Sequence, residues 1–261
     1  MPRNTPPEDE FYIGYVPRMP HGIGRLMVRI AAALAALAVL AGLTLVVAQK
    51  PFERATFEYG QFRDFTGVIE TKPYPALLVR RPAASGGTSP YSRYLLVAMG
   101  KHGADSCTTG LDGRHATLRG SLIYRDNQTM IELLPGSIRQ SPAGTPAEAS
   151  EVVLGPVTLT GEIVDSKCYL GVMNPGHTKV HRDCAVRCIS GGIPPAFITK
   201  DAFYLLTGSD GRRLNQEVLD IAGETIEVRG LAVRSGDTLI LRAEPTAFRR
   251  VARNNSSLSR P

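Results

Sequence analysis

Residues 225–241, TIEVRGLAVRSGDTLIL, contain two strand-like segments separated by a turn. Apolar and polar residues alternate in TIEVRGLAV, and TLIL is a short apolar run of strand length. The intervening RSGD supplies the glycine and aspartate that favour a hairpin turn. An earlier stretch, ATLRGSLIYRDNQTMIEL at 116–133, follows the same pattern with RDNQ as its turn. The sequence therefore predicts two hairpins of one kind.

The similarity extends outward from the hairpins to two further landmarks. The offset between the copies is 94 residues for the first landmark and 110 for the later ones. Landmarks in the same order indicate two copies of one unit, which we place at 57–140 and 155–248. The paired landmarks are FTGVIET (65–71) with LTGEIVD (159–165), and YLLVAMGKHG (94–103) with YLLTGSDGRR (204–213).

Each predicted unit has four or five strands, one longer connection and glycines within its strands. This combination favours a small Greek-key barrel of the OB type, with an irregular β-sandwich as the alternative. The strand glycines suit the tight bends of a small barrel. They are Gly67, Gly120, Gly161 and Gly230. The predicted fold is therefore mainly β, with two tandem OB-like units.

The second unit contains an insertion that the first unit lacks. The matched glycine and tyrosine are 27 positions apart in the first copy (Gly67 to Tyr94) and 43 positions apart in the second (Gly161 to Tyr204). The extra residues fall where Cys168 to Cys188 lie. A long loop on a rigid scaffold is a common place for function.

The insertion is expected to contain a helix of three to four turns. Asn174 or Thr178 can cap its start, and Gly191-Gly192 followed by prolines can end it. Four His and Cys side chains, spaced by four, three and four residues, then lie on one face of this helix. A further cysteine lies at the end of the preceding strand and can reach the same face. The group on the face is His177, His181, Cys184 and Cys188, and the arriving residue is Cys168.

Three interpretations of this group stay open. Cys168 can form a disulfide with Cys184 or Cys188, which leaves one thiol that could meet Cys107. Thiolates with imidazole can instead bind zinc, copper or an iron–sulfur cluster. The cysteines can also be plain buried side chains.

The segment resembles a bacterial exported OB-like domain that has no established function. The shared pattern is G-x-[IV]-V-D-x-x-C, then H-x-x-C-A-x-x-C-[IV]-x-x-G-x-P, then a strand with tyrosine, over about residues 159–245. The resemblance implies an exported β-domain and supports grouping Cys168, His181, Cys184 and Cys188. His177 lies outside the pattern and ranks below His181. The matching residues are Gly161, Asp165, Cys168, His181, Cys184, Ala185, Cys188, Gly191 and Pro194.

Weaker candidates lie around this group. Asp165 could orient a ligand or a base, although aspartate at a strand end usually caps a turn. His102 and Cys107 form a second small polar group in a glycine-rich loop. No catalytic residue is assigned, because the chain carries neither G-x-S-x-G nor H-E-x-x-H.

Residues 26–48 predict one transmembrane helix. From Ile30 to Ala48 the only polar side chain is Thr44, and 19 helical residues span about 30 Å of hydrocarbon. Cleavage after Ala48 is the alternative, but the apolar run is longer than a usual signal core. We expect a single-pass protein of the bacterial inner membrane, with residues 1–25 as a cytoplasmic tail and the C-terminal part in the periplasm. Residues 141–154 are predicted as a linker and 249–261 as a disordered tail.

The predicted function is a periplasmic accessory or assembly subunit of a membrane redox complex, contacting partner subunits through the transmembrane helix. Its second unit would hold a metal or a structural disulfide. One alternative is a thiol–disulfide oxidoreductase that uses Cys184 or Cys188. Another is an OB-fold nucleic-acid binder, which the scattered distribution of the +6 net charge disfavours.

Overall fold

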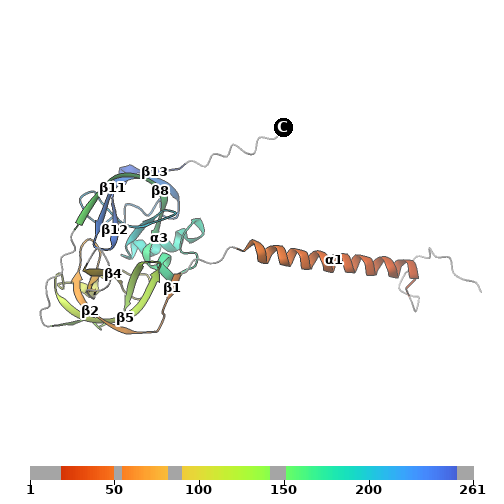
Figure 1. Ribbon diagram of the computed structural model, residues 1–261, viewed down its shortest axis with the longest axis horizontal. Helices are drawn as coiled ribbons and strands as arrows, with labels where there is room; N and C mark the ends of the chain where they lie inside the picture. Colours follow the sequence, from red (N-terminus) through yellow and green to blue (C-terminus); the bar gives the residue numbers. More distant parts are fainter. Residues whose placement is uncertain (1–18, 50–54, 82–89, 142–150, 252–261) are drawn as a thin grey trace, which may run out of the picture. The chain divides into compact units, whose positions relative to one another are not determined.

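A computed structural model of the chain describes residues 19–49, 55–81, 90–141 and 151–251. It divides into two compact parts, an N-terminal part (residues 1–52) and a C-terminal part (residues 53–261) (Figure 1). The N-terminal part contains the helix α1 (His21–Ala48), which begins five residues before the predicted span. Residues 1–18 of the predicted tail lie outside the described residues.

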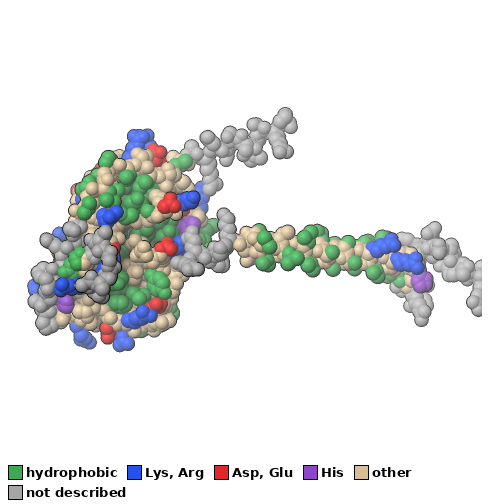
Figure 2. All heavy atoms as spheres, in the orientation of Figure 1, with side chains coloured by type: hydrophobic (Ala, Val, Ile, Leu, Met, Phe, Trp, Pro, Cys, Tyr) green, Lys and Arg blue, Asp and Glu red, His purple; other side chains and the backbone are tan. Residues whose placement is uncertain are grey.

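Helix α1 has the properties of a membrane-crossing segment or of a signal sequence. None of its 28 residues is buried. Apolar side chains line its length, and basic side chains gather near its N-terminal end (Figure 2). These are Arg25 and Arg29. The helix is therefore long and apolar enough to cross a bilayer.

The first of the two sheets in the C-terminal part closes on itself. Its order is β5-β2-β3-β4-β6, and β6 pairs back to β5. Every pairing in this ring is antiparallel except β4 with β6, which is parallel. Strands β1 and β7 add to β5, and a short helix, α2 (Asp105–Thr108), follows β4. The strands are β1 (Ala55–Phe57), β2 (Arg63–Glu70), β3 (Ala76–Arg80), β4 (Tyr91–Val97), β5 (His115–Arg125), β6 (Gln128–Leu133) and β7 (Arg139–Gln140).

The second sheet repeats this arrangement. Its order is β11-β8-β9-β10-β12, with β12 paired back to β11 and β10 parallel to β12. The outer strand β13 joins β11, and a 3₁₀ turn (Pro245–Ala247) precedes it. The two barrel-like sheets of five strands confirm the mainly β prediction. The strands are β8 (Glu151–Asp165), β9 (Pro195–Ile198), β10 (Phe203–Thr207), β11 (Thr225–Ser235), β12 (Thr238–Arg242) and β13 (Phe248–Arg250).

Both predicted hairpins are present. The earlier one is β5–β6, where Arg125 pairs with Gln128. The later one is β11–β12, where Ser235 pairs with Thr238. Part of the predicted linker, from Glu151, belongs to β8, and part of the predicted tail forms β13. Residues 142–150 and 252–261 lie outside the described residues.

The strand glycines mark places where backbones approach closely. A Cβ atom at Gly161 would lie 2.1 Å from the carbonyl oxygen of Ile198, and one at Gly67 would lie 2.3 Å from that of Leu78. Any side chain at either position would push the neighbouring strand away. The same requirement at equivalent strands explains why both copies carry glycine there.

Three apolar cores stabilise the C-terminal part, residues 53–261. One lies within the first sheet around Ile69 and Leu96, and one within the second around Phe197 and Leu241. The third core, here called the seam, combines side chains of both sheets and includes two cysteines of the insertion. Its fully buried members include Val97, Ile123, Met130, Val164, Cys168, Cys188, Ile193 and Leu205.

We predict that Gly161→Ala destabilises the second unit by about 1–3 kcal/mol, because overpacking moves β9 away from β8. Urea unfolding of the full chain in detergent, followed by the circular dichroism of its strands, measures the change. Thr160→Ala, at the neighbouring exposed position, is the control and should shift stability by less than about 0.5 kcal/mol. Equal effects of the two substitutions would contradict the prediction.

Candidate metal centre

The insertion folds into three short helical segments between β8 and β9. They are a π-helical turn η1 (Cys168–Val172), a 3₁₀ turn η2 (Lys179–His181) and the helix α3 (Arg182–Ser190). Of the two predicted starts, Asn174 is wrong, because Pro175 and Gly176 interrupt the segment there. The helical run of η2 and α3 begins directly after Thr178, the other predicted start, although Thr178 makes no side-chain cap hydrogen bond. Its end agrees with the sequence analysis: Gly191 follows directly, and Gly192 has a φ of +95°.

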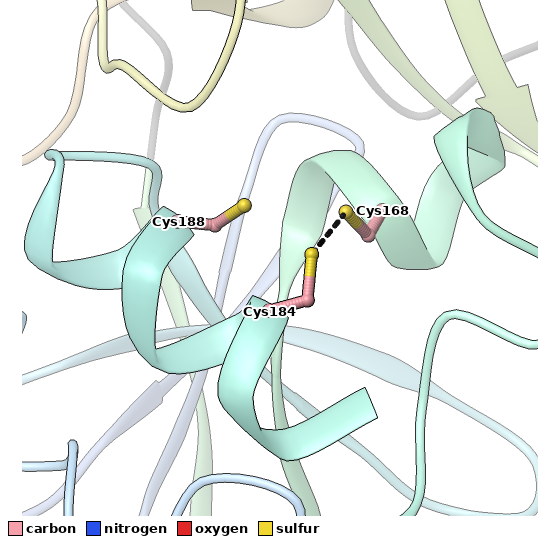
Figure 3. A group of neighbouring side chains, drawn as sticks. All are labelled: Cys168, Cys184 and Cys188. Atoms are coloured by element: carbon pink, nitrogen blue, oxygen red, sulfur yellow. Dashed lines mark hydrogen bonds between the residues drawn. The ribbon is translucent and has the colours of Figure 1, made fainter. Parts of the chain in front are cut away.

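The sulfur atoms of Cys168, Cys184 and Cys188 converge. All three Sγ atoms lie within 4.8 Å of one another, and those of Cys168 and Cys184 are 3.9 Å apart. Figure 3 shows the two α3 side chains and the η1 side chain pointing toward a common point. The spacing of four residues places Cys184 and Cys188 on one face of α3. Among the described residues these three form a group compact enough to hold a metal ion.

No disulfide joins the cysteines, because all four thiols of the chain are free. A disulfide needs an S–S distance of about 2.05 Å. In contrast, two sulfurs that bind one ion at about 2.3 Å are separated by roughly 3.8–4.0 Å in tetrahedral or trigonal geometry. The 3.9 Å between the Cys168 and Cys184 sulfurs is a thiol–thiol hydrogen-bond contact, and it falls in the range that two sulfurs on one ion would have.

The site is sheltered on one side and accessible on the other. Cys168 and Cys188 are 3% and 1% exposed and belong to the seam, whereas Cys184 is half-buried. Glycines hold the backbone around Cys168: a Cβ at Gly176 would lie 2.5 Å from the Cys168 carbonyl oxygen, and one at Gly171 would lie 2.4 Å from that of Thr56. The position of the Cys168 thiol is therefore determined by backbone packing.

Asp165 and His181 form a buried pair beside Cys168. The Asp165 Oδ2 lies 2.9 Å from the His181 Nε2, and its Oδ1 accepts a 2.8 Å hydrogen bond from the backbone N–H of Cys168. Asp165, Cys168 and His181 form a second group whose donor atoms lie within 4.8 Å of one another. This carboxylate–imidazole pair orients the loop that carries Cys168 and resembles the supporting shell of many metal sites.

Lys101 reaches the cysteines from the first barrel. Its Nζ lies 3.1 Å from the Cys184 Sγ, and this hydrogen bond raises the pKa of Lys101. The loop that carries Lys101 docks on the end of α3, where the N–H of Gly103 donates to the carbonyl oxygen of Gly191 at 2.9 Å. A Cβ at Gly191 would lie 2.0 Å from the Lys101 carbonyl oxygen. Only glycine at 191 permits this approach.

The pKa values of two of the thiols are shifted in opposite directions. A hydrogen bond between Cys168 and Cys188, with burial acting second, raises the pKa of Cys168. The same hydrogen bond lowers the pKa of Cys188, and the positive charge of Lys101 contributes in the same direction. Of these two thiols, Cys188 is the one that loses its proton more readily. A thiolate is the form that binds metal ions or attacks disulfides.

A second lysine fixes the first barrel next to the site. Lys167 is 3% exposed and forms an ion pair with Glu132 of β6. Its Nζ also donates to the carbonyl oxygens of Ala98 and Gly100, at 2.9 and 2.6 Å. Lys167 precedes Cys168 directly, so the ammonium group connects the site to the loop that presents Lys101.

Of the four weaker candidates, Asp165 lies beside Cys168, and the other three lie away from the sulfur group. The Nδ1 of His177 is 4.0 Å from the Glu162 Oε2, and its ring meets Tyr169 edge-on. Cys107, in α2, packs against the core of the first sheet, and His102 is exposed. Within the described part of the chain, none of the three belongs to a group of donors close enough to hold a metal.

Sequence reasoning did not identify Lys101 or Lys167 as part of the site. Lys101 stands in the first-unit landmark YLLVAMGKHG, directly after a strand, where loops often carry function. Lys167 lies between two residues of the recognised pattern. The sequence suggested a contact between the first unit and the insertion only as a possible pairing with Cys107, not through Lys101.

No protein-family model, curated protein or solved structure matches the chain. The resemblance to a bacterial exported domain therefore stays a prediction, and the site is interpreted from its own geometry.

We predict that Lys167→Met destabilises the second unit by about 3–5 kcal/mol, because Glu132 keeps a buried charge without its partner. Urea unfolding of the full chain measures the loss. Adding Glu132→Gln should recover part of it, since the unpaired carboxylate is then removed. Lys200→Met, at an exposed position, serves as the control and should change stability by less than about 0.5 kcal/mol.

Proposed function

We propose that the chain is a membrane-anchored accessory protein that holds a soft metal ion on Cys168, Cys184 and Cys188. The convergence of three sulfurs, with 3.9 Å between two of them, carries this proposal. Thiolates favour soft or borderline ions such as copper(I) and zinc. The half-buried Cys184 gives the ion an access route, and the buried pair of Asp165 and His181 supports the loop beneath it.

The accessory role rests on the combination of this site with α1. The helix suits a single pass through the bacterial inner membrane, with the second unit in the periplasm. Such a protein would present its metal near the membrane surface, where it could serve the assembly or function of a redox complex. Partner subunits would contact α1 within the bilayer.

We further assign both barrels to the OB type. Counting the five ring strands of each sheet from one to five, the order is 1-2-3-5-4 with closure from four to one. Strands three and five are parallel in both copies. This arrangement supports a five-stranded Greek-key barrel. The two barrels are the scaffold and the insertion is the functional element.

Thiol–disulfide exchange is the second candidate function. Cys184 is partly accessible, lies 3.1 Å from the ammonium of Lys101 and has Cys168 at 3.9 Å as a resolving thiol. This arrangement suits a nucleophile activated by a nearby cation. A dithiol exchange uses two sulfurs, whereas the metal centre uses all three, so the metal centre accounts for more of the geometry.

The proposed function predicts one metal ion per chain. Cys168→Ser, Cys184→Ser and Cys188→Ser should each lower the bound metal severalfold or more, because each removes one of three ligands. Cys107→Ser is the matched control and should retain full occupancy. Elemental analysis with thiol counting on the full chain in detergent measures both. Metal-free protein with all four thiols reactive and rapid disulfide exchange would favour the second candidate instead.

The proposed location predicts the orientation of the chain. A reporter that is active only in the periplasm should give signal when it is fused after residue 251, and a cytoplasm-only reporter at that place should not. Fusion of the same reporters near residue 20 should give the opposite result. A cytoplasmic second unit would leave the metal site intact but remove the periplasmic role.

A further inference from the structure

We propose that the ion held by Cys168, Cys184 and Cys188 is copper(I), bound by three sulfurs only, and that Lys101 of the first barrel selects it over zinc. This inference rests on the proposed metal-binding function. It assigns the kind of ion and adds a residue outside the insertion that determines specificity.

The number of available donors is the first argument. A tetrahedral ion with bonds of about 2.3 Å needs a fourth donor at roughly 3.8 Å from each sulfur. Within residues 19–49, 55–81, 90–141 and 151–251, no fourth histidine, cysteine or carboxylate donor lies within 4.8 Å of all three sulfurs. His181 is within that distance of Cys168 but also bonds Asp165.

Protein zinc in structural sites takes four protein ligands, whereas this site offers three. Copper(I) is a soft ion with a filled d shell, and three thiolates in a plane satisfy it. Zinc would need water or another external donor to complete its shell. The three-sulfur geometry therefore favours copper(I).

The charge of Lys101 is the second argument. Its ammonium lies 3.1 Å from the Cys184 Sγ and faces the sulfur group. With the same three thiolates bound, a zinc site carries one more positive charge than a copper(I) site. A fixed cation nearby therefore disfavours zinc relative to copper(I) by one charge–charge interaction, whatever number of protons the thiols release.

The packing of the barrels keeps this cation in place. The loop of Lys101 is held by the Gly103–Gly191 hydrogen bond and by Lys167, which binds the carbonyl oxygens of Ala98 and Gly100. The Lys101 side chain is itself exposed, so solvent weakens its effect. We therefore expect a selectivity contribution of about three- to tenfold.

The test compares affinities for two probe ions in the full chain in detergent. Copper(I) is titrated without oxygen against bicinchoninate, and zinc against a pyridylazo chelator. Lys101→Met should lower the ratio of copper(I) to zinc affinity about three- to tenfold. Lys101→Arg, which keeps the charge, and Lys200→Met, which removes a distant lysine, should leave the ratio within about twofold of the unsubstituted chain.

X-ray absorption of the copper-loaded chain supplies an independent readout, with three sulfur neighbours expected. Four-coordinate copper, or a ratio unchanged by Lys101→Met, would overturn this inference while metal binding by the three cysteines stands. A chain that binds neither ion at one equivalent would overturn the proposed function as well. The exposed position of Lys101 makes loss of folding on substitution unexpected, and circular dichroism of each variant verifies this.

Discussion

The apolar seam between the two barrels is the interaction on which the site depends. Its members come from both sheets, and two of the three site cysteines are among them. Burying these side chains together removes apolar surface from water at about 25 cal/mol per Å². Each barrel has its own interior core, so the seam does not build either barrel. It determines how the barrels meet, and thereby which loops of the first face the insertion of the second.

The contacts at the edge of the seam hold the loop of the first barrel against the insertion of the second. Gly103 and Gly191 let two backbones approach to hydrogen-bonding distance, and a side chain at either would meet a carbonyl oxygen at 2.3 or 2.0 Å. Lys167 places an ammonium group among carbonyl oxygens of the same loop. Its charge is buried but paired with Glu132, which is the condition for tolerating it. Residues of both copies therefore form the site, although its three cysteines, Cys168, Cys184 and Cys188, all belong to the second copy.

The sequence predicted features that depend on local chemistry and missed those that depend on docking. The hairpins followed from alternation and turn residues, and the end of α3 followed from Gly191-Gly192. Of the two predicted starts, Asn174 was wrong because Pro175 and Gly176 follow it, whereas the helical run begins directly after Thr178. His177 therefore lies before the helical run. Lys101 is far from the cysteines in sequence and belongs to the other barrel. Its position beside the cysteines depends on how the two barrels pack at the seam, and hydrophobic periodicity in the sequence does not predict that packing.

The same packing bears on the choice between a metal ion and a disulfide at these three thiols. A disulfide between Cys168 and Cys184 would require their sulfurs to move from 3.9 Å to about 2.05 Å. The backbone at Cys168 is held by close glycine contacts, and Asp165 binds its N–H. An ion placed between the sulfurs needs no such approach, because two sulfurs bound to one ion stay about 3.8–4.0 Å apart. A periplasmic location would oppose this preference, because oxidation of neighbouring thiols is favoured there. In the proposed site, a bound ion would remove this conflict, because thiolates that bind a metal are withheld from oxidation.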